Sequence, residues 1–324
     1  MTKESQVKIV FWGTPDFAVK PLEVLIENFN VLAVITNPDE PVGRKAILTP
    51  PPIKVLARKY KIPVFQPNKL AIENCKLEIP SADIYVVAAY GKIISKEILE
   101  IPKYGALNIH PSLLPKWRGA SPIQYAILNG DEETGVTIML MDEKMDHGPI
   151  FAWRELEIRN PKSEIRKYTT PELSEILSKM GAELIIETVP KWINGEIKPV
   201  TQDEDKATYS KILKKEDGRI DWSKSAEEVE RQVRAFTPWP GSFTYWKRSE
   251  KEVRLELLEA DIVKSADFPD NIALRGILIK DKRLFIKTGE GYLEILRIQP
   301  EGKKEMTAKE FINGYKDIDG ATLM

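Results

Sequence analysis

The chain has 324 residues, which is enough for two domains that each bury a sizeable core. Its apolar fraction of 42% and charged fraction of 30% are those of an ordinary soluble protein. The net charge of −1 gives no overall basic field for nucleic acid, so RNA binding would need a local basic patch.

Cysteine and histidine are scarce, which argues against disulfides and metal sites. The single cysteine, Cys75, cannot form a disulfide within the chain, as is usual in a reducing cytoplasm. Two histidines and one cysteine offer no recognised metal-ligand spacing, so no metal is expected. No apolar stretch approaches the ~18 residues of a membrane span, and the run at 9–12 is too short for a signal-peptide core. We therefore expect a cytoplasmic protein without a membrane or metal partner.

The first half of the chain alternates between strand and helix patterns. Gly13-Thr14-Pro15 forms a turn that starts a helix with an apolar stripe, and a second helix is predicted at 53–60. Between them, a polar, proline-rich loop at 38–52 contains Gly43-Arg44-Lys45. Buried strands are predicted at 7–12, 31–35, 84–89, 106–109 and 136–141. This alternation predicts an α/β, Rossmann-like domain with a mostly parallel sheet.

The second half changes from helical to period-two patterning. A helix is predicted at 171–194, broken or kinked near Pro190, and a polar linker follows at 195–215. Another helix is predicted at 226–236. Apolar residues then alternate with polar ones in short runs at 253–257, 277–279, 284–286 and 293–295. This pattern predicts a small antiparallel β-barrel of the OB-like type, with domains at 1–194 and 216–324 on either side of the linker.

Polar segments follow four of the predicted strands. Open α/β sheets bind ligands outside the carboxyl ends of their strands, so we expect these segments to line one shared cleft. The segments are Gly13-Thr14-Pro15, Tyr90-Gly91, 108–115 and 142–148.

The two histidines, His110 and His147, both lie in the window 105–148. In an extended strand Asn108 and His110 point to the same face. Together with Asp146 they supply an amide, an imidazole and a carboxylate, which can stabilise an oxyanion and move a proton. Each residue alone has a plainer interpretation, because a histidine at a strand end is usually structural and an aspartate before a glycine often forms a turn. For His147 we expect a loop role.

Four motifs in this region carry a family resemblance. They are Asn108-Ile109-His110, Ser112-Leu113-Leu114-Pro115, Trp117-Arg118-Gly119 and Asp146-x-Gly148. Together they resemble the core of the folate-dependent formyltransferases, and the set is highly specific although each piece alone is weak. The segments similar to the members of this family that act on methionyl-tRNA are 13–18, 38–52, 215–222 and 234–241, and the match covers roughly residues 7–306.

The resemblance implies transfer of the formyl group of 10-formyltetrahydrofolate to the amino group of methionyl initiator tRNA, for translation initiation. Asn108 and His110 would donate to the oxyanion that forms when the amine attacks the formyl carbon. His110 would also move the proton, and Asp146 would orient His110 or act through a water. No covalent nucleophile is required.

The same resemblance implies the binding residues. A flat, polar-edged pterin suits an apolar wall with backbone hydrogen bonds. Arg44 and Lys45, on the long loop, are expected to meet phosphates of the tRNA acceptor stem. The C-terminal barrel is expected to bind tRNA as well, and we expect a monomer. The residues expected to bind folate are Ser112, Leu113, Leu114, Pro115, Tyr90, Gly91, Ile93, Met141, Asp142 and Gly148.

Other functions stay open on the sequence alone. A sugar-amine N-formyltransferase would share the three polar residues, but lacks the tRNA-type loop and usually carries a different C-terminal domain. A formyltetrahydrofolate hydrolase would use water as the acceptor and is expected to carry a regulatory domain ahead of the catalytic one. A nucleotide-dependent dehydrogenase is disfavoured because Gly13-Thr14-Pro15 lacks the G-x-G-x-x-G pattern. A module that only binds RNA would not need an amide, an imidazole and a carboxylate together.

Overall fold

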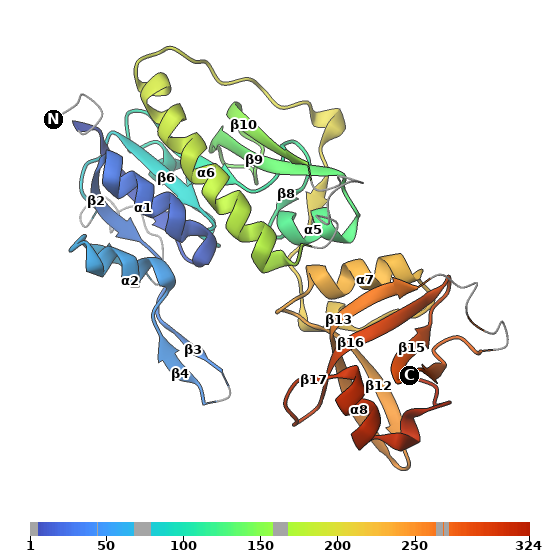
Figure 1. The fold of residues 1–324 in the computed structure, drawn as a ribbon. Helices are drawn as coiled ribbons and strands as arrows, with labels where there is room; N and C mark the ends of the chain where they lie inside the picture. The colour runs from blue at the N-terminus through green and yellow to red at the C-terminus, as the bar shows by residue number, and fades with distance from the viewer. Residues whose placement is uncertain (1–5, 44, 68–78, 158–167, 264–267, 269–271) are drawn as a thin grey trace. The chain divides into compact units, whose positions relative to one another are not determined.

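The computed structural model describes residues 6–43, 45–67, 79–157, 168–263, 268 and 272–324 (Figure 1). Arg44 and Cys75 lie outside the described residues. The chain forms two compact units, and each is assembled from three stretches of sequence. The N-terminal unit contains Met1–Pro122, Glu132–Ile158 and Leu173–Lys211, and the C-terminal unit contains Ile123–Asp131, Arg159–Glu172 and Ile212–Met324. The two units therefore interleave along the chain, unlike the continuous domains expected from the sequence.

The N-terminal unit is built on a seven-stranded sheet in the order β10-β9-β7-β6-β1-β2-β5. Its central strands are parallel and almost fully buried, which explains their near-continuous apolar sequences. Only β9 runs against both of its neighbours. The predicted Rossmann-like, mostly parallel sheet is confirmed. The strands are β1 (Lys8–Gly13), β2 (Asn30–Ile35), β5 (Val64–Phe65), β6 (Ile84–Ala88), β7 (Ala106–His110), β9 (Glu133–Leu140) and β10 (Ile150–Glu157).

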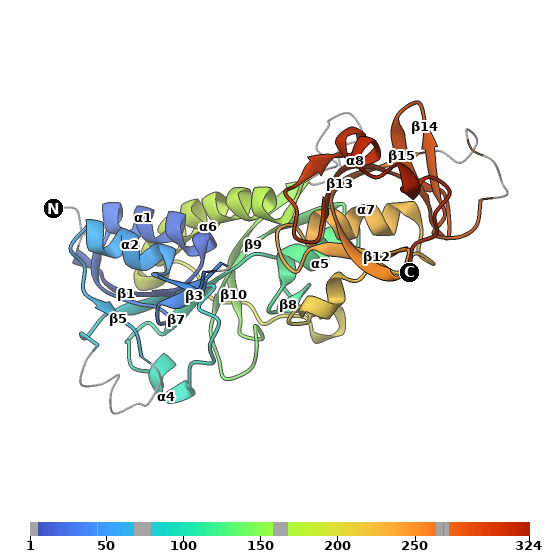
Figure 2. The same ribbon diagram turned by 90° about the horizontal axis from the view of Figure 1, so that it is seen from below.

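Helices cover both faces of this sheet. Figure 2 shows α1, α2 and α6 on one face and the short α4 on the other. A side-chain carbon at Gly181 of α6 would lie 2.5 Å from Cγ2 of Ile109, so a glycine lets this helix pack closely on β7. Among the described residues, no helix is long and apolar enough to cross a membrane. The helices are α1 (Val19–Asn28), α2 (Pro52–Lys59), α4 (Lys96–Leu99) and α6 (Thr170–Ile193).

The helix α6 continues through Pro190 to Ile193, so the predicted break at this proline is wrong. Proline removes one backbone hydrogen bond from a helix. Here the loss falls near the C-terminal end, and the amide of Asn194 still bonds to the carbonyl of Pro190 at 2.9 Å. The preceding turns are held by a buried apolar side, which includes Leu177 and Ile185.

The proline-rich segment 38–52 is a hairpin in part, where the sequence predicted a loop. β3 (Glu40–Val42) pairs with β4 (Ile47–Thr49) in antiparallel fashion (Figure 1). Gly43 and Ala46 both have positive φ, at 72° and 47°, as a tight hairpin turn requires. The short strands have no alternating apolar pattern, because β4 is exposed throughout, and periodicity therefore could not reveal them.

The segment expected to be a linker at 195–215 packs on the N-terminal unit as far as Lys211. Val200 bridges to Ile150 of β10, and β11 (Tyr209–Ser210) pairs in parallel with β8 (Arg118–Gly119). The side chains of Gln202, Glu204, Thr208 and Ser210 bond to the rest of the unit, while other polar side chains of the segment, such as Lys206, are exposed.

The C-terminal unit is a curled, antiparallel sheet (Figure 2). Its period-two residues face a shared core with α7 and α8, which includes Trp246, Leu257 and Phe311. The predicted antiparallel β-domain is confirmed, in the form of a half-barrel. Its elements are α7 (Ala226–Ala235), β12 (Ser242–Arg248), β13 (Lys251–Val263), β14 (Ile277–Lys280), β15 (Arg283–Lys287), β16 (Tyr292–Pro300), β17 (Met306–Thr307) and α8 (Ala308–Gly314).

Residues close to the C-terminus connect the two edge strands of this sheet. Leu323 bridges to Trp246 of β12, and Thr322 bridges to Gly276 just before β14. The amide of Leu323 bonds to the carbonyl of Arg275 at 3.0 Å, and its side chain is buried at 2% exposure. The segment thus covers edges that would otherwise present unpaired backbone groups.

Replacement of Leu323 by alanine should lower the free energy of unfolding of the C-terminal unit by about 2–5 kcal/mol, because it leaves a cavity where this segment closes the sheet. Urea denaturation followed by tryptophan fluorescence measures the change. Met324→Ala, which alters a neighbour with 37% of its surface exposed, is the matched control and should cost less. Equal midpoints for Leu323→Ala and the unaltered protein would contradict this role.

Candidate active site

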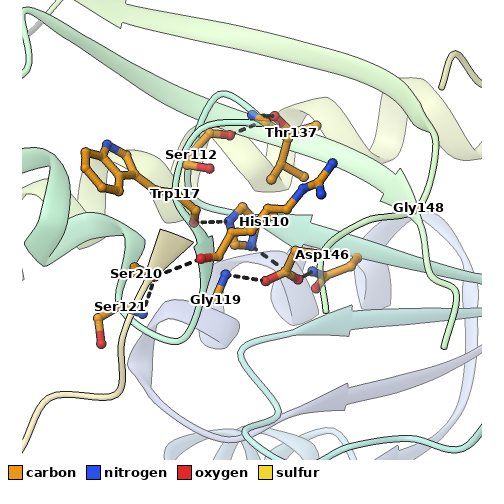
Figure 3. A network of polar contacts seen from close by, with 12 residues as sticks. His110, Ser112, Trp117, Gly119, Ser121, Thr137, Asp146, Gly148 and Ser210 are labelled. Atoms are coloured by element: carbon orange, nitrogen blue, oxygen red, sulfur yellow. Dashed lines mark hydrogen bonds and ion pairs between the residues drawn. The ribbon is translucent and has the colours of Figure 1, made fainter. Parts of the chain in front are cut away.

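β7 presents two polar side chains to the face of the sheet opposite α6. Ile109 packs under α6, so its neighbours Asn108 and His110 point to the other face. Both are buried, with 8% and 4% of their surfaces exposed. Thr137 of β9 lies opposite His110 on the same face (Figure 3). This placement agrees with the sequence pattern, in which Asn108 and His110 are two residues apart.

The strand that precedes Asp146 runs in the opposite direction to the one predicted. β9 is antiparallel to β7, and Leu140 near its end pairs with Leu107 near the start of β7. The segment 142–148 therefore does not leave the sheet at the carboxyl end of a parallel strand, and that part of the prediction is wrong. An apolar run predicts a strand but does not encode its direction.

The loop after β9 nevertheless brings Asp146 to both polar residues of β7, and Figure 3 shows it beside His110. Its Oδ1 lies 3.5 Å from Nδ2 of Asn108 and 3.7 Å from Nδ1 of His110. These contacts are long, as is common for catalytic groups before a substrate draws them together. An amide, an imidazole and a carboxylate thus converge on one point, as the sequence predicts.

The orientation of His110 is set by a backbone carbonyl. Its Nε2 lies 3.1 Å from the carbonyl oxygen of Trp117, which can only accept, so Nε2 carries a proton (Figure 3). In the neutral ring, Nδ1 is then the nitrogen that can accept a proton, and it faces Asp146. Trp117 and Asp146, the two contacts of the ring, both have left-handed backbones with φ of 59° and 48°. Such conformations cost free energy outside glycine and cluster at functional sites.

The carboxylate of Asp146 is also anchored on its second oxygen. Oδ2 accepts the backbone N–H of Gly119 at 2.7 Å. A side-chain carbon at Gly119 would lie 2.3 Å from the carbonyl oxygen of Ser210, and φ is 115°, so this position requires glycine. Strand β8 can therefore approach β11 and hold the carboxylate at the same time.

The segment Ser112–Pro115, expected to border folate, forms a buried turn beside β7. The hydroxyl of Ser112 donates to the carbonyl of Lys116 at 2.5 Å. The backbone carbonyl of Ser112 accepts from Thr137 Oγ1 at 2.7 Å. Thr137 Oγ1 in turn accepts the amide of Leu114 at 3.1 Å. The Ser112 side chain is thus engaged within the protein. Leu113 borders β9, since a side-chain carbon at Gly135 would lie 2.5 Å from its Cδ2.

The residues after β6 connect three strand ends. The carbonyl of Tyr90 accepts from Thr14 Oγ1 at 3.2 Å and from Asn37 Nδ2 at 3.1 Å. The tyrosine side chain is buried, whereas Ile93 is 86% exposed. Gly91 has a φ of 79°, which turns the chain outward between them. The carboxyl ends of β1, β2 and β6 therefore meet, as expected for a parallel sheet.

A cavity of about 500 Å³ lies beside the end of β9. It is lined by two of the residues expected to bind folate, Met141 and Asp142, and by His147. Asn108, His110 and Asp146 are not among its lining residues, and neither are the other expected folate residues. The remaining walls combine apolar and charged groups, among them Leu99, Leu140, Lys96, Lys103 and Lys144. Gly148 has a packing role, because a side-chain carbon there would lie 1.8 Å from the carbonyl oxygen of Leu140.

His147 occupies a loop position, as the sequence analysis expects. Its Nδ1 lies 2.7 Å from Asp142 Oδ2, and its Nε2 lies 3.5 Å from Glu204 Oε1. Among the described residues its polar contacts are with these two carboxylates and not with His110.

Two family models match the chain. Residues 7–189 match the model described as formyl transferase, and residues 212–316 match the formyl transferase C-terminal domain. The chain belongs to the formyl transferase family. It is 44% identical over 316 residues to a methionyl-tRNA formyltransferase of Thermodesulfovibrio yellowstonii, and the match covers 96% of this chain and 97% of that protein. The resemblance inferred from the motifs is confirmed.

Solved structures share the fold of this formyl transferase. HypX from Aquifex aeolicus, in complex with tetrahydrofolic acid, superposes with a TM-score of 0.61 at 18% identity. That match covers 97% of this chain and 48% of HypX, so the chain spans about half the length of HypX. An N-formyltransferase from Helicobacter canadensis, in complex with folinic acid and dTDP-3-aminofucose, gives a TM-score of 0.64 at 18% identity and covers 93% of this chain and 100% of that one.

The structure adds three polar residues that the sequence analysis did not single out in this formyl transferase. Arg118, Gln202 and Glu204 form a bonded group next to Asp146. The guanidinium of Arg118 holds the pKa of the Glu204 carboxyl well below its usual range, and Glu204 raises the pKa of Arg118 in return. Arg118 stands in a family motif, which was one available signal. Gln202 and Glu204 lie in a polar stretch without periodicity, and only the folded chain brings them to the site.

Proposed function

We propose that this chain transfers the formyl group of 10-formyltetrahydrofolate to the free amino group of methionyl initiator tRNA. The observation that carries the proposal is the convergence of Asn108, His110 and Asp146 in a chain that matches a methionyl-tRNA formyltransferase over almost its full length. The amide, imidazole and carboxylate are the groups that acyl transfer to an amine requires.

Asn108 is the donor proposed for the developing oxyanion. When the amine attacks the formyl carbon, the formyl oxygen gains negative charge and needs a hydrogen-bond donor already in place. The amide Nδ2 of Asn108 carries two N–H groups, and its hydrogen bond to Asp146 is 3.5 Å long. An N–H group of Asn108 is thus available to the oxyanion without the loss of a strong hydrogen bond.

His110 is the group proposed to move the proton. The attacking nitrogen loses a proton as the new C–N bond forms, and N10 of the folate gains one as its bond to the formyl carbon breaks. Nδ1 of His110 can accept the first proton, because Nε2 is already committed to the carbonyl of Trp117. The Asp146 carboxylate at 3.7 Å favours the imidazolium that results. The proton then passes to the leaving folate nitrogen.

For the folate we propose the region between this cluster and the cavity beside β9. The cavity volume of about 500 Å³ is in the range of small-molecule sites. Its apolar walls suit a flat ring. Its lining also holds Glu100, Asp142 and Glu143, and Lys96 lies 3.9 Å from Glu143, so Lys103 and Lys144 are the lysines proposed to pair with the carboxylates of a folate. HypX, which shares the fold, was crystallised with tetrahydrofolic acid. Tyr90, Gly91, Ile93 and the segment Ser112–Pro115 remain proposed contacts of the same ligand.

The turn of the β3–β4 hairpin is the proposed contact for tRNA phosphates. Lys45 is exposed there, beside the turn residues Gly43 and Ala46. A lysine on a projecting turn can reach a phosphate without burial of its charge. Arg44, its neighbour in sequence, is proposed for the same role, as is the C-terminal unit for a further part of the tRNA.

Lys45→Ala should raise KM for tRNA and reduce the slope of log(kcat/KM) against log salt concentration by about 1, because one phosphate contact is lost. Initial rates at several salt concentrations measure both effects. The control is Lys191→Ala, an exposed lysine near the end of α6 in the N-terminal unit, which should leave the slope unchanged. A salt slope that does not change in Lys45→Ala would remove Lys45 from the tRNA interface.

The proposed function is tested by offering the purified protein 10-formyltetrahydrofolate with one of three acceptors. Methionyl initiator tRNA should become formylated, as seen by mass spectrometry of the released formylmethionine. An amino sugar nucleotide should not react, and water alone should release little formate. Formylation of the sugar in place of the tRNA would establish a sugar-amine N-formyltransferase, and rapid formate release without an acceptor would establish a hydrolase.

A further inference from the structure

We infer that Gln202 is a positioning residue that holds Asp146 in place for the reaction. The inference rests on the proposed function and extends it to a residue outside the motifs that carry the family resemblance. Gln202 follows α6 in sequence and has no contact with Asn108 or His110 among the hydrogen bonds of the described residues. Its effect on the reaction therefore passes through Asp146.

Gln202 clamps the backbone of the loop that carries Asp146. Its Nε2 donates to the carbonyl of Asp146 at 2.9 Å and to the carbonyl of Gly148 at 2.7 Å. The side chain is 5% exposed, so these bonds do not compete with bulk water. One amide group thus fixes the loop on both sides of His147.

The orientation of this amide is itself determined by Arg118. Nε and Nη2 of Arg118 both donate to Oε1 of Gln202, at 3.0 and 2.9 Å. Because a guanidinium can only donate, the oxygen of Gln202 must face Arg118 and the NH₂ group must face the loop. Arg118 is 1% exposed, and its charge is balanced by Glu204, which accepts at 2.9 and 2.7 Å. All polar groups in this chain of contacts have partners.

The loop needs such a clamp because its conformation is unfavourable. Asp146 has a φ of 48°, and Gly148 lies so close to β9 that no side-chain carbon fits. Strand β8 acts at two points: Gly119 holds the carboxylate of Asp146, and Arg118 orients the glutamine that holds its backbone. Loss of the two Gln202 bonds should let the loop relax, and Oδ1 would then move away from the polar residues of β7.

Gln202→Glu tests this role, because a carboxylate keeps the size of the side chain and its pairing with Arg118 but cannot donate to the two carbonyls. We expect kcat for methionyl-tRNA formylation to fall by about 10²-fold, the usual effect of a misplacement near 1 Å. KM for methionyl-tRNA should change by less than about threefold, since no group proposed to contact tRNA is altered, whereas KM for the folate should rise, because the same loop carries the proposed folate residues Asp142 and Gly148. The control is Gln232→Glu, which changes a buried glutamine of the C-terminal unit whose Nε2 also donates to a backbone carbonyl.

A double variant separates positioning from a general structural role. In an Asp146→Ala background, Gln202→Glu should lower kcat by no more than about twofold, because the group it positions is absent. A further fall in kcat as large as that of the single variant would overturn the inference. Normal kcat in Gln202→Glu alone would overturn it as well. Gln202→Met, which removes both donors without a new charge, should reproduce the single-variant result.

A measurement that does not depend on activity tests the role of Gln202 separately from the proposed function. Amide hydrogen exchange in the unaltered protein and in Gln202→Glu should show faster exchange across residues 141–149 and no change in the C-terminal unit. Unchanged exchange in this loop would overturn the clamp. An inactive unaltered protein would instead refute the proposed function, and the exchange result would still decide whether Gln202 holds the loop.

Discussion

Replacement of Asn108 by alanine is expected to lower kcat by about 10²- to 10³-fold, the effect of removing one preorganised donor from an oxyanion. KM should change little, because the ground-state carbonyl needs this donor less than the tetrahedral intermediate does. Folding should be nearly unaffected, since the hydrogen bond lost to Asp146 is 3.5 Å long. Steady-state kinetics with methionyl-tRNA and 10-formyltetrahydrofolate measure the change.

The matched control for Asn108 is Asn194→Ala, at an exposed position just after α6. Its kcat should equal that of the unaltered protein. If Asn108→Ala retains near-normal kcat, the oxyanion must be stabilised by another donor, and Asn108 has no part in the chemical step.

His110→Ala is expected to reduce kcat by about 10²- to 10⁴-fold, the contribution of a positioned proton-transfer group. The ring is buried and its removal leaves a space beside Asp146, so added imidazole should restore part of the activity. The dependence of kcat on imidazole concentration at fixed pH provides the measurement.

Rescue by imidazole distinguishes proton transfer from packing. His147→Ala is the control, because this ring contacts Asp142 and Glu204 in the loop but not the polar residues of β7. It should retain most of the kcat and show no imidazole effect, and its loss should act on KM for the folate, because His147 lines the cavity proposed for that substrate. Full activity of His110→Ala without imidazole would show that a different group transfers the proton.

The sequence predicted the part of the site that depends on local pattern. The residues of β7 form a buried run, and the spacing of Asn108 and His110 alone places them on one face. The same reasoning predicted the parallel core of the sheet and the antiparallel character of the second unit. Periodicity is sufficient for these features because burial of one or both faces decides them.

Features that depend on pairing between distant segments could not be predicted from local sequence patterns. The direction of β9 is set by its pairing with β7 and β10. Its buried apolar sequence is equally compatible with a parallel and an antiparallel strand. Strand β4 of the hairpin is exposed throughout, so no alternation of buried and exposed residues marks it. Gln202 is 56 residues from Asp146, and no local rule connects an isolated polar residue to a loop so distant in sequence.

The smallest active fragment of this protein must contain more than the residues proposed to contact substrate. A fragment that ended at residue 194 would include Asn108, His110 and Asp146, yet the amide of Trp117 would lose its acceptor on Thr208, and Ser121 would lose its own on Ser210. Removal of residues 195–211 should therefore abolish formylation, although Asn108, His110 and Asp146 are all still present.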